Sequence, residues 1–389
     1  MKRVLLSIAI LTLLPLSWLQ AGTGSQSGNR LNSESKRIID DFAERLQKDV
    51  TSDNIGSISA AIFIGDSIVW SKAFGKANRE NFATADTGTV YRAASITKTI
   101  TAYLMMLLVQ NGSINLDDPV VKYLPEIKNI LQNSLLKSNL ITFRHLASHT
   151  SGLAEEPELS STSSGQIEQW EEKTLQSIPQ TKLESNPGEK FSYSNIGYAI
   201  LGLALSRAVN RPYIELVTEM VFNPLQMKNS FFIIPKGYEN NVAVGYRWGA
   251  FTGEVDAEKA KNEHKGRGYR VPNGGIYTTP NDMACFLMAQ CNSTANPLLP
   301  EHISDMQSIQ TPESNNFGYG LGYYIRNNDK GITMVEHDGG VAGYNAFMVF
   351  NPESRIGVIL MRNYSFGLTN ILLLPRTVLS ELVEAEKIK

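Results

Sequence analysis

The chain has 389 residues, of which 42% are hydrophobic and 19% are charged, and its formal net charge is −2. This composition is that of an ordinary globular protein, and the length allows one large domain or two smaller ones with a sizeable core. Near-neutral charge without a basic run in the mature chain argues against a nucleic-acid surface or a strongly charged membrane face. Small-molecule or peptide chemistry is the favoured function class.

The first residues have the pattern of a secretory signal peptide. A basic start precedes an apolar run over residues 4–19, which ends near the small residue Ala21. The run is shorter than the ~20 residues that a membrane-spanning helix needs. We therefore expect residues 1–21 to be a cleaved signal peptide and the protein to be exported, periplasmic or secreted, without a stable membrane span. An uncleaved anchor is the alternative, and residues 22–35 are predicted to be a flexible leader.

The next part of the chain predicts a helix packed on a hairpin, followed by a mainly helical region. Helical periodicity over residues 37–46 precedes β-rich runs over 57–69. A Ser- and Glu-rich segment over 155–166 predicts a loop or flap. Nearly continuous apolar residues predict buried helices over residues 95–110 and 195–209, and a third helix fits residues 213–221.

The C-terminal part returns to strands. A helix near residues 281–289 is followed by strand patterns over 320–325, 332–336, 342–350 and 356–361, and then by an amphipathic helix over 368–385. The predicted fold class is α+β: an antiparallel sheet flanked by helices and built from both chain ends, with an inserted mainly α-helical domain. The predicted boundaries are 36–90 with 313–389 for the sheet domain and 91–312 for the insertion. An active site is expected in the cleft between them.

The tetrapeptide from Ser95 to Lys98 is the first candidate site. Ser-x-x-Lys arises easily by chance, and it also occurs at Ser33 and Ser134, but only Ser95 precedes a strongly apolar helix. On a helix the lysine lies about 60° around the axis from the serine, so both share one face. A lysine in an apolar cleft has a lowered pKa and can act as the base that a serine nucleophile needs. The structural alternative is a capping serine beside a lysine that reaches water.

Two later clusters supply the remaining groups of an acyl-transfer site. Tyr193 can relay a proton, and Asn195, at the start of a second apolar helix, can hold the lysine or a substrate carbonyl. His337 ends an apolar strand, and Gly339 with Gly340 lets backbone N–H groups approach a ligand. Taken singly, each cluster also fits a structural role, as a hydrogen-bonded tyrosine, a helix cap or a strand-end bulge.

The order of the three clusters resembles that of the serine β-lactamase and penicillin-recognising family. This family includes class C β-lactamases, D-alanyl-D-alanine carboxypeptidases, D-aminopeptidases and esterases, and the likeness spans most of the mature chain. Further similar stretches lie at residues 91–94, 116–119, 148–153, 191–195 and 274–277.

The resemblance implies an antiparallel sheet beside a helical domain and assigns a role to each site residue. It makes Ser95 the acylated nucleophile, and it gives the general base and acid work to Lys98 and Tyr193. Asn195 would orient Lys98 and the substrate. The N–H groups of Ser95 and Gly340 would form the oxyanion hole.

The third motif departs from the family pattern. Many β-lactamases have Lys-Thr-Gly where this chain has His337, Asp338 and Gly339. A carboxylate at Asp338 that faced the cleft would repel a substrate carboxylate by about 1 kcal/mol. No Glu-x-x-Leu-Asn element of the class A type is present either. Efficient β-lactam hydrolysis is therefore not expected.

These observations predict an exported serine hydrolase that forms an acyl-enzyme at Ser95. Its expected substrate is a D-amino-acid peptide, such as one derived from the cell wall, a β-lactam-like amide or an ester. The alternative is a penicillin-binding or sensor module that is acylated without efficient turnover. The histidines lack metal-ligand spacing, so neither a metal nor a cofactor is predicted. Cys285 and Cys291 would lie about 9 Å apart on one helix, which favours two buried free thiols over a disulfide.

Overall fold

The computed structural model describes residues 31–131, 136–248, 254–264, 267–291, 296–314 and 316–387. The predicted signal peptide and residues 22–30 of the predicted leader lie outside the described residues. Across the described ranges, no helix is both long enough and apolar enough to cross a membrane.

The first helix, α1, begins earlier than predicted. It spans Ser33–Asp53, so the last residues assigned to a flexible leader are helical. Asn32 caps this helix, since its Oδ1 accepts a hydrogen bond from the Ser35 N–H at 2.7 Å. The Ser-x-x-Lys tetrapeptide at Ser33 therefore lies within α1. Asn32 and Ser33 lie in the segment predicted to be a flexible leader, since the apolar periodicity that indicates a helix begins only at Ile38.

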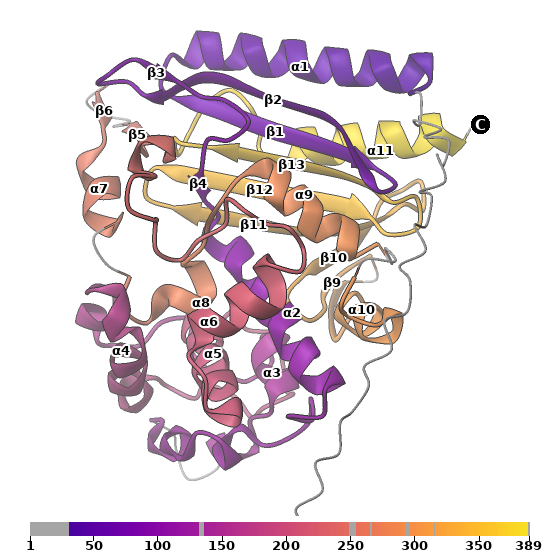
Figure 1. Ribbon diagram of the computed structural model, residues 1–389. Coiled ribbons are helices and arrows are strands. Elements are labelled where there is room, and N and C mark those ends of the chain that lie inside the picture. The colour runs from indigo at the N-terminus through magenta and orange to yellow at the C-terminus, as the bar shows by residue number, and fades with distance from the viewer. Residues whose placement is uncertain are drawn as a thin grey trace, which may run out of the picture.

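In the described residues both chain ends build one nine-stranded antiparallel sheet, in the order β3-β2-β1-β13-β12-β11-β10-β9-β8 (Figure 1). The strands are β1 (Ser57–Ile64), β2 (Ser67–Asn78), β3 (Ala83–Thr84), β8 (Thr311–Ser314), β9 (Phe317–Tyr319), β10 (Tyr324–Asn327), β11 (Thr333–Val341), β12 (Tyr344–Asn351) and β13 (Ile356–Arg362). The two ends meet where β1 pairs with β13, with Ile58 opposite Arg362. The predicted antiparallel sheet from both chain ends is confirmed.

Helices cover both faces of this sheet. On one face lie α1 and the C-terminal helix α11 (Leu373–Lys387), and α9 (Pro280–Ala289) packs on the other face against β1, β2 and β13 (Figure 1). Successive residues of β1 therefore enter different cores: Ile62 joins the core with α1, and Phe63 joins the core with α9. A strand that is buried on both sides needs apolar residues at successive positions. The β-rich segment predicted over residues 57–69 has such a run.

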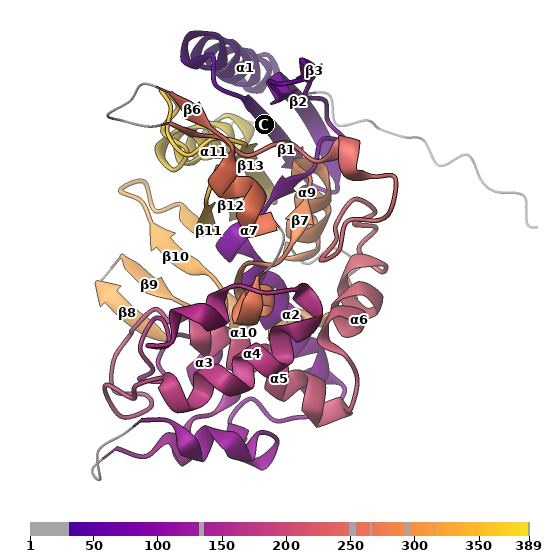
Figure 2. The ribbon, with the colours of Figure 1, turned by 90° about the vertical axis from the view of Figure 1, so that its left-hand side faces the viewer.

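The inserted region is mainly helical, and most of its helices lie on the side of the sheet away from α1 and α11, as Figure 2 shows. Its residues Tyr246 and Ala257 instead join the core that contains α1 and α11. Its helices are α2 (Thr97–Gln110), α3 (Phe143–Ala147), α4 (Trp170–Ser177), α5 (Asn195–Val209), α6 (Tyr213–Val217), α7 (Glu258–His264), α8 (Val271–Gly274) and α10 (Pro300–Met306). Two small pairs of strands accompany them: β4 (Tyr91–Arg92) with β7 (Tyr277–Thr278), and β5 (Arg247–Trp248) with β6 (Val255–Asp256).

The apolar helices α2 and α5 form the centre of the inserted region. Most residues of both are buried, which explains why their sequences are apolar nearly all round. The helix predicted over residues 213–221 is divided into α6 and a π-helical turn over Thr218–Phe222. Although α9 ends before Cys291, Cys285 and Cys291 are both free thiols, the first half-buried and the second buried.

Candidate active site

Ser95 lies in a sharp turn between a strand and a buried helix. The chain leaves β4, passes through a 3-10 turn over Ala94–Ile96 and enters α2 at Thr97, so the serine precedes the helix rather than occupying its first turn. Ala94 has φ 49°, a left-handed conformation that is strained for a residue with a Cβ. In a 3-10 turn the side chains of residues i and i+3 eclipse one another. This geometry brings Lys98 beside Ser95 more directly than a regular helix would.

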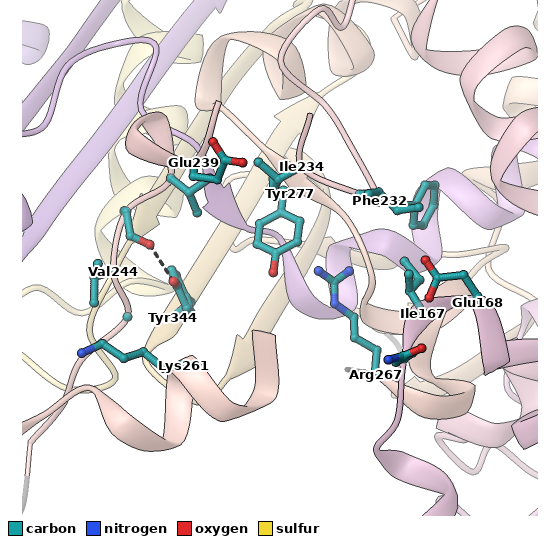
Figure 3. A pocket seen from close by; sticks show the side chains of 15 residues that line it. Ile167, Glu168, Phe232, Ile234, Glu239, Val244, Lys261, Arg267, Tyr277 and Tyr344 are labelled. Atoms are coloured by element: carbon teal, nitrogen blue, oxygen red, sulfur yellow. Dashed lines mark hydrogen bonds between the residues drawn. The ribbon is translucent and has the colours of Figure 1, made fainter. Parts of the chain in front are cut away.

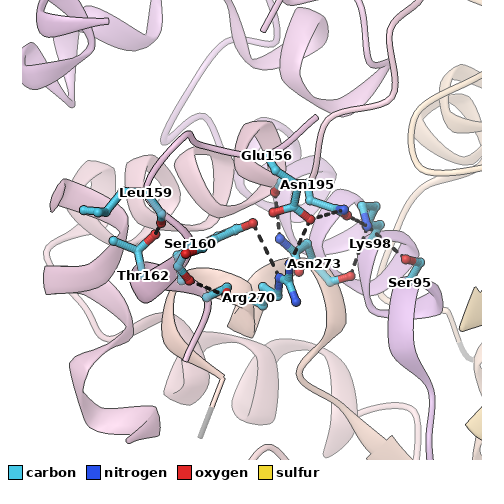
Figure 4. Close-up of polar contacts among 11 residues, drawn as sticks. Ser95, Lys98, Glu156, Leu159, Ser160, Thr162, Asn195, Arg270 and Asn273 are labelled. Carbon is cyan, nitrogen blue, oxygen red and sulfur yellow. Dashed lines mark hydrogen bonds and ion pairs between the residues drawn. The ribbon is translucent and has the colours of Figure 1, made fainter. Parts of the chain in front are cut away.

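Lys98 is fully buried, and its amine has three oxygen neighbours (Figure 4). Nζ lies 3.1 Å from Ser95 Oγ, 2.8 Å from Asn195 Oδ1 and 3.1 Å from the Asn273 carbonyl oxygen. Two of these oxygens can only accept hydrogen bonds. A neutral amine would donate its two N–H groups to them and direct its lone pair at the serine hydroxyl. The contacts therefore fit a lysine acting as a base.

Burial lowers the pKa of Lys98 to about 7, although nearby carboxylates, Glu156 foremost, raise it. A substantial fraction of this lysine is therefore uncharged near neutral pH. An exposed lysine would be almost fully protonated there.

Tyr193 is held against Lys98 and stays protonated. Lys98 Nζ lies 4.7 Å from the centre of the Tyr193 ring. Burial raises the pKa of Tyr193 well above its usual value, although a hydrogen bond with Ser95 opposes this effect. The sequence suggested that Tyr193 could ionise beside an ammonium group, but these surroundings favour a neutral phenol that donates its proton.

His149 fixes the position of Tyr193. Its ring centre lies 4.2 Å from that of Tyr193 and 5.0 Å from that of Tyr198. Its Nδ1 accepts a hydrogen bond from the Ser194 N–H at 3.0 Å, and burial lowers the pKa of His149 well below its usual value. His149 is therefore a neutral support for Tyr193, a role that the similar stretch at residues 148–153 did not identify.

Asn195 is oriented by a second group of polar side chains (Figure 4). It begins α5 directly after the capping residue Ser194. Asn195 Nδ2 donates to Glu156 Oε1 at 2.9 Å, and the same carboxylate pairs with Arg270 at 3.1 Å. Since a carboxylate only accepts, this contact places the amide nitrogen toward Glu156 and the amide oxygen toward Lys98.

Sequence reasoning missed Glu156, Arg270 and Asn273. Glu156 lay in the segment predicted to be a flap, and Asn273 directly precedes the similar stretch at residues 274–277. Asn273 Nδ2 donates to the Asn195 backbone carbonyl at 2.7 Å, so this residue contacts both the lysine and the start of α5. Only the tertiary fold brings these residues together, and no local spacing signals them.

The His337 side chain is buried and is not among the residues that line the cleft. It is 1% exposed, its Nδ1 donates to the Asp338 carbonyl at 2.6 Å, and its Nε2 accepts from the Tyr319 hydroxyl at 3.2 Å. Burial lowers the pKa of His337 to about 4, so the ring is neutral near neutral pH. Asp338 is exposed and lies on the same face of β11 as Gly340, which lines the cleft.

Gly339 lets β11 pack directly on the 3-10 turn that contains Ser95. A Cβ at this position would lie 2.2 Å from the Ala93 carbonyl oxygen and 3.1 Å from the Ser95 nitrogen. Neither distance leaves room for a side chain. The predicted glycine pair thus has two roles: Gly339 permits close packing, and Gly340 borders the cleft.

The cleft has a volume of about 680 Å³ and lies at the junction of the sheet and the helical region. Its walls include Ser95, Asn195, Gly340 and the newly found Glu156, Arg270 and Asn273. The structure thus brings the three predicted clusters together around one cavity. In the described ranges no group of three or more His, Cys, Asp or Glu side chains could hold a metal ion.

Known proteins resemble this chain in sequence. A sequence profile of the family described as Beta-lactamase matches residues 40–373. The chain is 25% identical over 337 residues to Protein flp of Staphylococcus aureus (strain MW2), covering 86% of this chain and 64% of that protein. It is 28% identical over 351 residues to Beta-lactamase-like protein 4 of Dictyostelium discoideum, covering 83% of this chain and 59% of that protein. The chain thus spans less than two thirds of the length of these relatives.

A solved structure has the same fold. The octameric penicillin-binding protein homologue from Pyrococcus abyssi superposes with a TM-score of 0.72, covering 90% of this chain and 77% of that chain at 24% sequence identity. This likeness extends to the antiparallel sheet and the helical region. With the profile match over most of its length, the chain belongs to the beta-lactamase family.

Proposed function

We propose that the protein is a serine hydrolase that forms an acyl-enzyme at Ser95. The observation that carries the proposal is the position of Lys98. Its amine is fully buried, contacts two acceptor oxygens and lies 3.1 Å from Ser95 Oγ. Such an arrangement supplies the base that a serine hydroxyl needs before it can attack a carbonyl.

The acylation step follows from the protonation states. Neutral Lys98 accepts the Ser95 hydroxyl proton while Oγ forms a bond to the substrate carbonyl carbon. The N–H groups of Ser95 and Gly340 stabilise the oxygen that becomes negative. As the tetrahedral adduct collapses, the bond to the leaving group breaks and the leaving group takes the Tyr193 proton. Tyr193 regains a proton from Lys98.

Hydrolysis of the acyl-enzyme uses the same groups in reverse. A water molecule gives a proton to Lys98 and attacks the ester carbon. The bond to Ser95 Oγ then breaks, and the serine regains a proton. The product is a free acid, and the enzyme returns to its starting state.

The proposed substrate class is an ester, a β-lactam-like amide or a D-amino-acid peptide, and esters and simple amides fit best. Where many β-lactamases have a lysine, His337 is neutral and buried. The exposed Asp338 on the adjacent position adds negative charge near the cleft. A substrate carboxylate would therefore gain little from this part of β11, so slow β-lactam turnover is expected. The signal-peptide pattern of residues 1–21 supports export as part of the proposal.

A second candidate is a penicillin-binding or sensor module that is acylated without efficient turnover. The altered third motif favours it, since this motif lacks the cation found in many β-lactamases. The two candidates differ in the number of product molecules released. A module would release one product per protein molecule and then stop, whereas a hydrolase continues at a steady rate.

The test is a turnover screen with wild type, Ser95→Ala and the exposed-serine control Ser308→Ala. The substrates are nitrocefin, a D-Ala-D-Ala peptide, a D-aminoacyl anilide and a short acyl ester. We expect many turnovers of at least one substrate by wild type and Ser308→Ala, and a loss of about 10³-fold or more in Ser95→Ala. Equal activity in Ser95→Ala would contradict the proposal, and a single burst from wild type would favour the second candidate.

A further inference from the structure

A second cavity, of about 520 Å³, shares the lining residue Arg267 with the cleft. Figure 3 shows the side chains that line it. Its size is within the range of small-molecule sites, about 300–1,000 Å³. Much of its wall is apolar and includes Ile167, Phe232, Ile234, Val242, Val244 and Tyr277. Such a surface favours an apolar ligand over a charged one.

The walls of this cavity are continuous with those of the cleft. Arg267 lines both spaces. Helix α7 contributes Asn262 to the cleft and the adjacent Lys261 to the cavity. At the turn between β11 and β12, Val341 borders the cleft and Tyr344 borders the cavity. Two separate parts of the chain, the stretch from α7 to Arg267 and the turn between β11 and β12, thus border both spaces.

Arg267 is a fixed part of the lining that the two spaces share. It is 5% exposed, its Nη1 donates a hydrogen bond to the Gly275 carbonyl, and its guanidinium carbon lies 4.3 Å from the centre of the Tyr277 ring. Figure 3 shows the guanidinium directed toward that ring. The Arg267 charge is therefore already engaged by the protein. Glu168, Glu239 and Lys261 also line the cavity, and Lys261 pairs with Glu258 at 3.4 Å, so the apolar side chains supply the part of the lining that suits an acyl chain.

The cavity lies on the acyl side of Ser95. Tyr193, which protonates the leaving group, packs on His149, and the His149 ring centre lies 4.9 Å from that of Tyr319 in β9. The leaving group must therefore lie toward β9, near the start of β11. The cavity lies beyond the opposite end of β11, past Gly340 and toward Tyr344. An acyl chain bound to Ser95 and directed away from Tyr193 runs toward it.

We propose that this cavity binds the acyl chain of the substrate, and that the substrate carries an apolar chain of medium length such as octanoyl. The inference rests on the proposed function, because it assigns a substrate class to the same Ser95 site. Burying more methylene groups in an apolar cavity lowers the barrier for longer chains relative to acetyl. The proposed chemistry is unchanged: the ester bond is hydrolysed to an alcohol and a fatty acid.

The kinetic test compares p-nitrophenyl octanoate with p-nitrophenyl acetate. We expect kcat/KM of wild type to favour octanoate by on the order of 100-fold. Val242→Trp fills the cavity and should reduce kcat/KM for octanoate by about tenfold or more while that for acetate changes by less than about threefold. Ile234→Trp is a second filling variant, in case the first folds poorly. Leu140→Trp adds the same bulk at a surface position that is 52% exposed and should behave as wild type.

A binding test separates this proposal from the proposed function. Calorimetry measures the binding of octanoate and acetate to Ser95→Ala, which needs no turnover. Octanoate should bind more tightly than acetate, and Val242→Trp in the same background should abolish the difference. No octanoate binding, or equal binding with and without Val242→Trp, would overturn the acyl site even if Ser95 hydrolyses acetate. Octanoate binding without any Ser95-dependent hydrolysis would support the cavity and count against the hydrolase.

Discussion

Glu156 tunes the base of the proposed reaction through charge. It is the carboxylate that most strongly raises the pKa of Lys98, which burial lowers to about 7. Only the uncharged form of Lys98 accepts the serine proton. The value of kcat/KM should therefore rise with pH through this pKa, with its half-maximal point near pH 7.

Glu156→Gln separates the charge of this residue from its hydrogen bond. A glutamine oxygen can still accept from Asn195 Nδ2, but the negative charge is gone, so the pKa of Lys98 falls further. The rising limb of the pH profile of kcat/KM should move to lower pH. The control is Glu158→Gln in the same loop, whose carboxylate pairs with Lys182 at the surface and should leave the limb in place. A limb that stays fixed or moves to higher pH in Glu156→Gln would refute this role.

The proximity of site residues that are close in sequence was predictable from the sequence. Ser95 with Lys98, and Tyr193 with Asn195, stand close together beside apolar helices, and short spacing was enough to pair them. Glu156 and Arg270 lie 114 positions apart, and only packing brings them to Asn195. The role of His149 also depends on the ring stack around it. Tertiary contacts of this kind leave no local pattern.

The close approach of β11 to the 3-10 turn at Ala94–Ile96 sets the geometry of the site. Gly339→Ala would place a Cβ 2.2 Å from the Ala93 carbonyl oxygen, so the strand and the turn must separate. We expect the free energy of unfolding to fall by about 1–3 kcal/mol. Gly340→Ala is the matched control, because its Cβ would meet only Asn345 Nδ2, at 3.4 Å.

Chemical denaturation of both variants measures these costs. Gly340→Ala should change the free energy of unfolding by no more than about 0.5 kcal/mol. Equal costs for the two substitutions would show that the close approach of β11 is not specific to Gly339.

The sequence predicted elements better than it predicted turns. Helix α5 spans Asn195–Val209 as expected, because a capping serine and a continuous apolar run mark it. The 3-10 turn at Ala94–Ile96 was not foreseen, since a left-handed alanine leaves no signal in the sequence. The helix α4 was also missed, because its sequence is more polar than those of α2 and α5.

The C-terminal helix α11 is attached to β11, the strand that borders the cleft, through a buried ion pair. Glu336 of β11 is 2% exposed and forms two hydrogen bonds with Arg376 of α11, at 2.6 and 2.7 Å. Removing the arginine would leave a buried carboxylate with only the more distant Arg326, at 3.4 Å. Arg376→Ala should therefore lower the free energy of unfolding by about 3 kcal/mol.

The matched control is Lys330→Ala, which breaks an exposed ion pair to Glu384 of the same helix. Its cost should be at most about 1 kcal/mol. Denaturant titrations of both variants give the comparison. A similar cost for both would mean that burial of Glu336 contributes nothing specific to the attachment of α11.

The overall architecture was predictable because both chain ends carry strand patterns and the middle carries helical ones. The pairing of β1 with β13 confirms that the two ends share one sheet. Helix α9 falls within the predicted insertion yet packs on the sheet, against β1, β2 and β13. An apolar helix suits either core, so composition alone cannot assign it to one of them.

The proposed function depends on acylation of Ser95 with Lys98 as the base. The most direct measurement is peptide mapping by mass spectrometry after an acyl ester is mixed with the protein and quenched in acid. Wild type should carry one acyl group on the peptide that contains Ser95, and Lys98→Ala should acquire it more slowly by about 10²-fold or more. Acylation of another residue, or equal acylation in Ser95→Ala, would rule out Ser95 as the nucleophile.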